Sequence, residues 1–89
     1  MNVTKTQNEN QSTFTLSGKL DTVTAPEFQK DLIPEFDTAK SVTVDFAGIS
    51  FVSSAGLRVL LMGEKTAKMK GSALIMTNVP PDVMEVFTK

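Results

Sequence analysis

The chain of 89 residues contains no cysteine, histidine, tryptophan or tyrosine. The lack of cysteine excludes disulfide bonds and thiolate chemistry, and the lack of both cysteine and histidine excludes the usual zinc sites. Without histidine there is also no imidazole to act as a general acid or base. The sequence therefore predicts no cofactor, no metal and no catalytic residue of these kinds.

The chain also has no excess of positive or negative charge and no long apolar run. Nine basic and ten acidic residues give a net charge of -1, whereas a nucleic-acid footprint needs a basic face. No apolar run approaches the length of about 20 residues that crosses a bilayer, and the polar first residues do not form a secretory signal. We therefore expect a cytoplasmic protein with no membrane span and no direct contact to nucleic acid.

The length and the mixed composition predict one small domain over residues 1–89 with a single core. Hydrophobic periodicity predicts strands at 3–6, 13–20, 41–46 and 73–77, and helices from Thr24 to about Pro34, at 54–70 and from Pro81 onward. Ala47-Gly48 is expected to form a turn. The order β-β-α-β-α-β-α predicts an α/β fold, in which a mixed sheet is covered by helices.

Several local predictions concern the helix ends and faces. Thr24 is expected to cap the first helix, with Glu27 completing a capping box, and Pro34 is expected to kink or end it. Gly71 should cap the 54–70 helix at its C-terminus. Phe28, Leu32 and Phe36 form an apolar stripe on the first helix, and the buried stripe predicted for the second helix is Leu57, Leu60, Leu61 and Ala67. The apolar residues of the last helix are Val83, Met84, Val86 and Phe87.

The most informative segment is DFAGISFVSSAGLRVLL at 45–61. An apolar strand stops at Ser53 and Ser54, and a helix begins there. The free N–H groups and the dipole of a helix N-terminus suit a capping hydroxyl, and they also suit a phosphate. The residues alone favour the cap, and phosphate acceptance is the alternative. Serine hydrolysis is disfavoured because there is no G-x-S-x-G elbow and no histidine.

Two aspartates also stand near strand ends, Asp21 before the first helix and Asp45 before Ala47. Aspartate at such places commonly accepts hydrogen bonds from nearby backbone N–H groups. We expect a turn or capping role for Asp21 and local backbone contacts for Asp45, in preference to a metal or acid–base cluster of these two residues with Asp37.

Four segments in this order resemble the STAS domain family, which is named for sulphate transporters and anti-sigma factor antagonists. They are LSGKLD at 16–21, DFAGI at 45–49, SSAGL at 53–57 and LIMTNV at 74–79. They are similar to the family's L-x-G-x-L-D, D-L-S-G-V and D-S-[ST]-G-[LV] patterns and to the strand and turn before its final helix. The resemblance covers nearly the whole chain and is greatest to single-domain bacterial anti-sigma factor antagonists.

The resemblance implies a regulatory protein, not an enzyme, that binds an anti-sigma factor serine kinase of the GHKL type. The kinase would phosphorylate Ser54, with Ser53 as the second candidate, and a PP2C-type phosphatase would reverse the modification. The unphosphorylated form would capture the kinase and free a sigma factor, which controls transcription indirectly. The expected partner-binding residues around Ser54 are Asp21, Ser53, Gly56, Leu57 and Arg58.

The sequence departs from the family pattern in three places. Ser53 stands where Asp is common, which removes a negative charge and adds a second hydroxyl, and Ala55 stands where Ser or Thr is common. The C-terminal helix is expected to be shorter than in relatives. An alternative function is a STAS accessory subunit of a lipid-transport ABC system, in which the domain braces an ATPase and is not phosphorylated.

Overall fold

The computed structural model describes the backbone of residues 1–88 and the side chains of residues 1–85. Its elements are β1 (Asn2–Asn8), β2 (Gln11–Leu20), α1 (Thr24–Glu35), β3 (Ser41–Val52), α2 (Ser54–Lys70), β4 (Ala73–Thr77) and α3 (Pro81–Thr88). The predicted order and the α/β class are confirmed. The first two strands are longer than predicted because the pairing continues into the polar turn between them.

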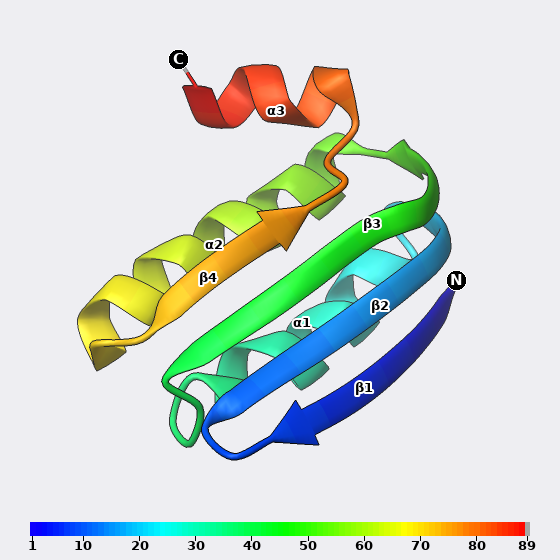
Figure 1. The fold of residues 1–89 in the computed structure, drawn as a ribbon. Helices are drawn as coiled ribbons and strands as arrows, with labels where there is room; N and C mark the ends of the chain where they lie inside the picture. Colours follow the sequence, from blue (N-terminus) through cyan, green and yellow to red (C-terminus); the bar gives the residue numbers. More distant parts are fainter. Residues whose placement is uncertain (89) are drawn as a thin grey trace.

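The four strands lie in the order β1-β2-β3-β4. β1 is antiparallel to β2, whereas β2, β3 and β4 run parallel to one another. Helices α1 and α2 cover one face of the sheet, α3 lies beyond the end of β4, and the other face is open (Figure 1). Because β2 and β3 end on the same side, the loops that leave them converge there.

The core lies between the sheet and helices α1 and α2. Alternate residues of β2 and β3 are fully buried, and Phe14 meets Phe28 edge to face with ring centroids 5.6 Å apart. The predicted stripe of Phe28, Leu32 and Phe36 is confirmed, since each is at most 2% exposed. Pro34 lies in the last turn of α1, which ends at Glu35 as predicted.

The predicted turn at Ala47-Gly48 is wrong, because β3 runs unbroken from Ser41 to Val52. Its pairing with β2 shifts register twice, each time with one extra residue on β3, so β-bulges absorb the break in the apolar pattern. A Cβ on Gly48 would lie 2.8 Å from the Ser17 Cβ. Glycine is therefore needed for the close approach of the strands at the first bulge.

The predicted buried stripe of α2 is partly wrong. Leu60 and Ala67 are buried, but Leu61 is 39% exposed and Leu57 is only half-buried. The buried line includes three positions that were not predicted, namely Gly56, Val59 and Gly63. The two glycines let α2 approach Leu20 and Leu32 closely, which turns the 56-59-60-63-67 line toward the core.

The ends of α2 and α3 follow the predictions in part. Gly71 caps α2 in the left-handed conformation, with φ of 71°. Of the apolar residues named for α3, Val83 is buried and Met84 is 45% exposed. Val86 and Phe87 lie outside the described side chains.

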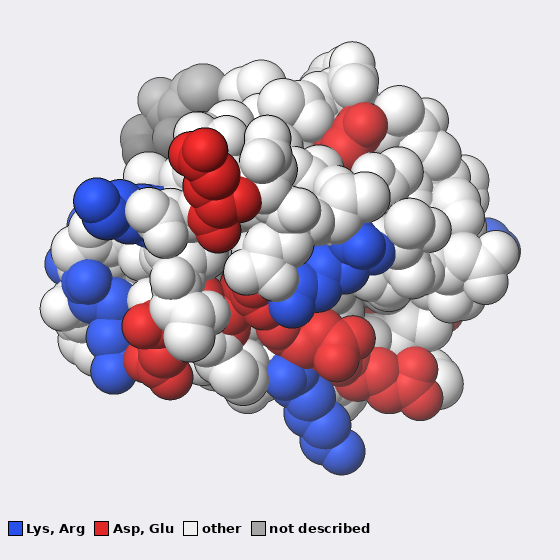
Figure 2. All heavy atoms as spheres, turned by 60° about the horizontal axis from the view of Figure 1, so that its bottom comes forward, with Lys and Arg blue, Asp and Glu red and all other residues white. Residues whose placement is uncertain are grey.

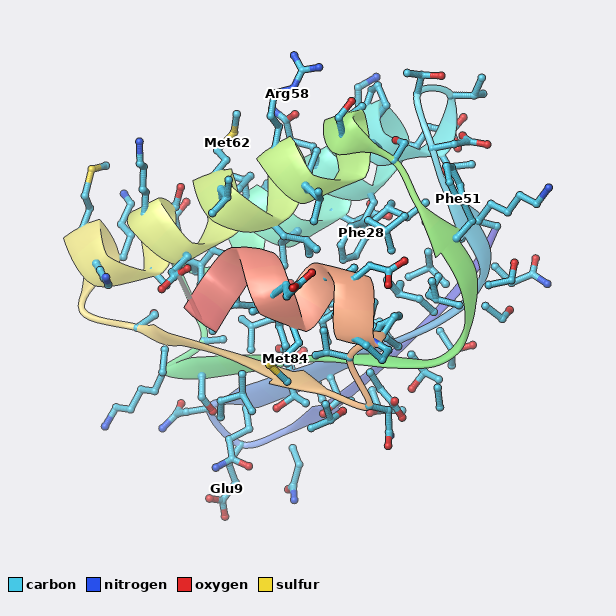
Figure 3. The ribbon with its side chains drawn as sticks, turned by 90° about the horizontal axis from the view of Figure 1, so that it is seen from above. Glu9, Phe28, Phe51, Arg58, Met62 and Met84 are labelled. Carbon is cyan, nitrogen blue, oxygen red and sulfur yellow. The ribbon has the colours of Figure 1, made fainter. Side chains whose placement is uncertain are left out.

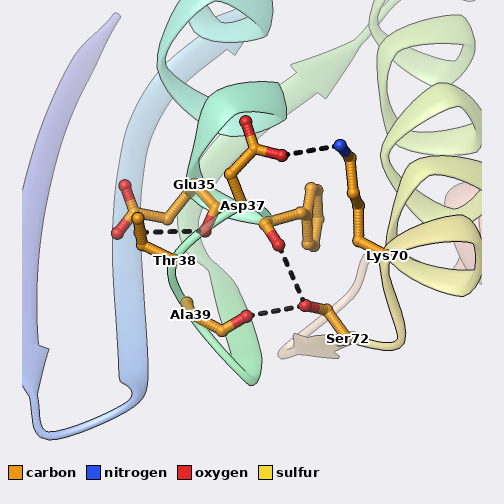
Figure 4. Close-up of polar contacts among 7 residues, drawn as sticks. Glu35, Asp37, Thr38, Ala39, Lys70 and Ser72 are labelled. Carbon is orange, nitrogen blue, oxygen red and sulfur yellow. Dashed lines mark hydrogen bonds and ion pairs between the residues drawn. The ribbon is translucent and has the colours of Figure 1, made fainter.

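Polar contacts connect the chain segments at the end of the molecule opposite to the carboxyl ends of β2 and β3. The Ser72 hydroxyl donates to the Ala39 carbonyl at 2.6 Å, and Lys70 pairs with Asp37 at 2.9 Å (Figure 4). These contacts join the segment after α1 to the last residue of α2 and to the turn that follows it. Direct contacts therefore hold the two segments together at this end.

A buried carboxylate ties the N-terminal hairpin to α1. Glu35 is 8% exposed; it accepts a hydrogen bond of 2.6 Å from the buried Ser12 hydroxyl and pairs with Lys5 at 2.8 Å. Burial opposes the ionisation of Glu35, but the hydrogen bonds from Lys5 and Ser12 outweigh it and lower the pKa. The carboxylate therefore stabilises the fold in its charged form.

Glu35→Gln is expected to lower the free energy of unfolding at pH 7 by about 1 kcal/mol. Because the pKa of Glu35 is lowered in the folded state, its stabilisation is complete above the unfolded pKa of about 4.3 and is lost as the pH falls through the folded pKa. Urea unfolding of the wild-type chain and of Glu35→Gln, repeated at pH values from about 3 to about 7, measures the pH dependence of this stabilisation. Glu9→Gln, in the exposed hairpin turn, is the control, and a pH-independent difference for Glu35→Gln would contradict the account.

Candidate functional site

The candidate site lies where β2 and β3 end side by side. Leu20 is paired with Val52 as the last residue of each strand, and the Leu20 carbonyl accepts a hydrogen bond of 2.9 Å from the Ser53 N–H. Asp21 follows Leu20 directly. The structure thus brings Asp21 and the serine pair to the same end of the sheet, as parallel strands require.

Asp21, and not Thr24, caps α1. Its Oδ1 accepts from the backbone N–H groups of Val23 and Thr24, each at 3.0 Å, and these bonds lower its pKa, the bond from Thr24 most. The predicted Thr24 cap and its capping box with Glu27 are wrong. The Ala25 N–H already donates to the Asp21 carbonyl at 2.8 Å, so the helical turn begins three residues earlier. The Thr24 hydroxyl instead donates to the Lys19 carbonyl at 2.8 Å.

Asp21→Ala is expected to lower the urea midpoint of unfolding, because two N–H groups of the first turn lose their acceptor. Because the pKa of Asp21 is lowered in the folded state, its contribution to stability is complete at pH values above the usual pKa of aspartate. This contribution is lost as the pH falls through the folded pKa. Asp31→Ala, at an exposed position of the same helix, is the control. Equal midpoints for the two variants would contradict the capping role.

The two serines differ in their environment. Ser53 is the N-cap of α2: its backbone is extended and its hydroxyl accepts from the Gly56 N–H at 3.3 Å. It is half-buried. Ser54 is the first residue of α2 and is exposed, and no hydrogen bond of its hydroxyl to the described residues is present. The cap predicted for this serine pair is therefore confirmed for Ser53, and Ser54 keeps an accessible hydroxyl.

The other expected site residues occupy the first turns of α2. Gly56 is buried, and a Cβ there would lie 2.8 Å from the Leu20 carbonyl oxygen; it holds α2 against β2. Leu57 packs partly against the core, and Arg58 is exposed. Arg58 projects from α2 away from the sheet (Figure 3).

Two exposed apolar residues near the serines were missed by sequence reasoning. Val23, in the loop before α1, is 73% exposed, and Phe51, beside the second bulge of β3, is 51% exposed. The position of Val23 between two threonines in a loop could have indicated that its side chain is exposed. The exposure of Phe51 had no such signal, because it depends on a register shift that the residue pattern does not reveal.

Asp45 has the local role that was predicted. Its Oδ1 accepts from the Asn78 side-chain amide at 2.9 Å and from the Ala47 N–H at 3.0 Å. These hydrogen bonds, the one from Asn78 most, lower the pKa of Asp45. Asp45 thus ties β3 to the turn that leads into α3.

The described residues contain neither a metal-ligand cluster nor a membrane-spanning helix. No three His, Cys, Asp or Glu side chains among them gather as a metal site would need, and none of their helices is long and apolar enough to cross a bilayer. On the face in Figure 2, acidic and basic side chains are interspersed. That face therefore lacks a continuous basic patch.

Comparison with known proteins identifies the family. Residues 3–89 match the family model described as Mlab, STAS domain. The chain belongs to the STAS domain family. It is also 30% identical over 73 residues to BtrV of Bordetella bronchiseptica, a protein named as an anti-sigma factor antagonist. The match covers 81% of this chain but 63% of the length of BtrV.

Solved structures confirm the fold. The unphosphorylated form of the anti-sigma factor antagonist SpoIIAA superposes with a TM-score of 0.87 at 17% identity, over 98% of this chain and 82% of that one. Its phosphorylated form, from Bacillus, gives 0.86 at the same identity, with 98% and 81% covered. An anti-sigma factor antagonist of Mycobacterium paratuberculosis gives 0.73 at 14% identity, with 99% and 94% covered.

Proposed function

We propose that this chain is an anti-sigma factor antagonist that binds an anti-sigma factor serine kinase of the GHKL type and is switched by phosphorylation of Ser54. The observation that carries the proposal is the exposed Ser54 hydroxyl on the first residue of α2. It stands at the end of the sheet where Asp21, Val23 and Phe51 also gather. The names of BtrV and of SpoIIAA, solved in both forms, support the same function.

The environments of the two serines favour Ser54 as the acceptor. Phosphorylation of Ser53 would take the hydroxyl that caps α2 through the Gly56 N–H and would place the phosphate at a half-buried position. Ser54 has neither restriction. A kinase therefore has an accessible nucleophile at Ser54 without having to disrupt the helix end.

A phosphate on Ser54 would be tolerated by the fold and harmful to an interface. It adds about −1.5 to −2 charges at a helix N-terminus, where the dipole and the free N–H groups favour negative charge. Arg58 stands four residues along the same helix, at a spacing where opposite charges attract. A partner packed over Ser54 would instead have to accommodate and desolvate the phosphate, which favours release.

The remaining parts of the switch follow from this function. A PP2C-type phosphatase would return Ser54 to its free form, and the chain would act in the cytoplasm as a binding protein without an activity of its own. Transcription would respond only indirectly, through the sigma factor that the captured kinase releases. Gly56 contributes by positioning α2, while Asp21, Ser53, Leu57 and Arg58 would form the partner-binding surface around the acceptor.

A second candidate is an accessory subunit of a lipid-transport ABC system. Two observations favour it: the matching family model is described as Mlab, and Ser53 replaces the aspartate that commonly precedes the phosphoacceptor. In this function the same end of the sheet would contact an ATPase permanently. Ser54 would then be the first residue of a capped helix and would stay unmodified.

Affinity purification of the chain from its native cell separates the two candidates. The antagonist function predicts a GHKL-type kinase in the eluate and phosphate that maps to Ser54 in the chain that is not bound to it. Recovery of an ABC ATPase with an unmodified chain would overturn the proposal and support the second candidate.

A further inference from the structure

Helix α2 has a line of apolar and basic residues on the side that faces away from the core. We call this line the outer stripe; it consists of Arg58, Leu61, Met62, Lys65 and Met69. Leu61, Met62 and Met69 are 39%, 42% and 79% exposed, and both basic residues are exposed as well. Their spacing of three, one, three and four residues aligns them along one face over about 16 Å.

Side chains of the outer stripe border an open depression on the surface of α2. Arg58, Leu61, Met62 and Lys65 line a hollow of about 380 Å³. A second hollow of about 240 Å³ lies between α1 and α2 and shares Arg58 and Met62 with the first; Pro26 and Gln29 form its α1 side. The two hollows are therefore adjacent, and Met62 stands between them.

The charges of the outer stripe are unbalanced. Among the described residues no ion pair involves Arg58 or Lys65, whereas the neighbouring Lys68 pairs with Glu64 at 3.8 Å. Two unpaired cations flank exposed Leu and Met side chains. A complementary surface would be apolar in the middle and acidic at its margins.

We propose that the outer stripe binds an amphipathic helix of the partner, with apolar side chains against Leu61 and Met62 and carboxylates toward Arg58 and Lys65. The proposal rests on the proposed function, because the partner is the anti-sigma factor kinase. The contact would adjoin the surface around Ser54, since Arg58 belongs to both. Flexible methionines suit such a groove because they adapt to the shape of the bound side chains.

Two other occupants fit the charges less well. In a two-fold contact between copies, the stripe would face itself, and Arg58 and Lys65 would meet basic residues. An anionic bilayer would attract the two cations, but the chain as a whole carries a net charge of -1, which opposes binding to a negatively charged surface.

Photo-crosslinking in the native cell tests the proposal with the full chain. Benzoylphenylalanine replaces Met62 to report on the outer stripe, Val23 to report on the surface around Ser54, and Glu9 as a control. Arg58 and Met62 lie on the far side of the molecule from Glu9 (Figure 3). Mass spectrometry identifies each crosslinked peptide.

The proposal predicts that the Met62 and Val23 probes capture the same kinase, and that the Met62 peptide has acidic and apolar residues at helical spacing. Capture of the kinase from Val23 alone would overturn the inference and leave the proposed function standing. Capture of a second copy or of lipid from Met62 would also overturn it. If neither probe captures a kinase, the proposed function fails and the inference fails with it.

A charge reversal gives an independent measurement with the captured kinase. Lys65→Glu is expected to weaken binding of the unphosphorylated chain roughly tenfold, and Lys40→Glu, at an exposed position after α1, is expected to leave it unchanged. An equal affinity for Lys65→Glu and wild type would overturn the inference.

Discussion

Ser54→Asp is expected to bind the partner kinase more than a hundredfold more weakly than the wild-type chain while remaining folded. A carboxylate on the first residue of α2 is favourable for the helix, because it meets the positive end of the dipole. In a packed interface the same charge must lose its water. A loss of roughly 3 kcal/mol of binding free energy corresponds to a factor of more than one hundred.

Titration calorimetry with the purified kinase measures the effect, and two variants provide controls. Ser54→Ala should bind as wild type does and should not respond to ATP. Ser53→Asp keeps a side chain that can cap the Gly56 N–H and places the charge one residue earlier, at a half-buried position. If Ser54→Asp bound as tightly as wild type, or if only Ser53→Asp lost affinity, Ser54 would not be the switch.

Gly56→Ala is expected to lower the free energy of unfolding by about 2 kcal/mol. The new Cβ would lie 2.8 Å from the Leu20 carbonyl oxygen, 2.9 Å from the Leu20 Cγ and 3.0 Å from the Val52 Cγ1. The closest neighbour is backbone, which cannot move aside without disturbing the sheet. The N-terminus of α2 would therefore be displaced from β2, and Ser54 would move with it.

Gly63→Ala is the matched control on the same helix. Its Cβ would approach the tip of the Leu32 side chain at 3.0 Å, which can rotate, and alanine favours the helix over glycine by up to about 1 kcal/mol. Urea unfolding of both variants should show a clear loss for Gly56→Ala only. Equal stability of the two variants would contradict the close packing of α2 on Leu20 as the reason for glycine at 56.

The sequence was sufficient for the features that depend on local pattern. The alternation around Phe14 and Leu16 predicted β2, and Gly71 predicted the end of α2, because each signal acts within a few residues. The β-bulges in β3 could not be predicted in this way. They depend on how β3 pairs with a strand about 30 residues earlier in the chain, where Gly48 pairs with Ser17 beyond the first register shift. A local break in the apolar pattern was therefore interpreted as a turn.

The sequence predicted the site residues that a family pattern marks. It did not predict the exposure of residues whose orientation depends on how α2 packs against the core. The serine pair and Asp21 follow from their positions at the ends of parallel strands. The rotation of α2 could not be predicted from leucine spacing, because Gly56 and Gly63 create the contact line with the core. That rotation exposes Leu61, which the leucine spacing had assigned to the core, and places it in the outer stripe.

The most direct test of the switch is the phosphorylation state of two pools of the chain from the native cell, one bound to the kinase and one free. Intact-mass analysis and peptide mapping should find the bound pool unmodified and a single phosphate on Ser54 in the free pool. Phosphate on Ser54 in the kinase-bound pool, or no phosphate in either pool, would contradict the account.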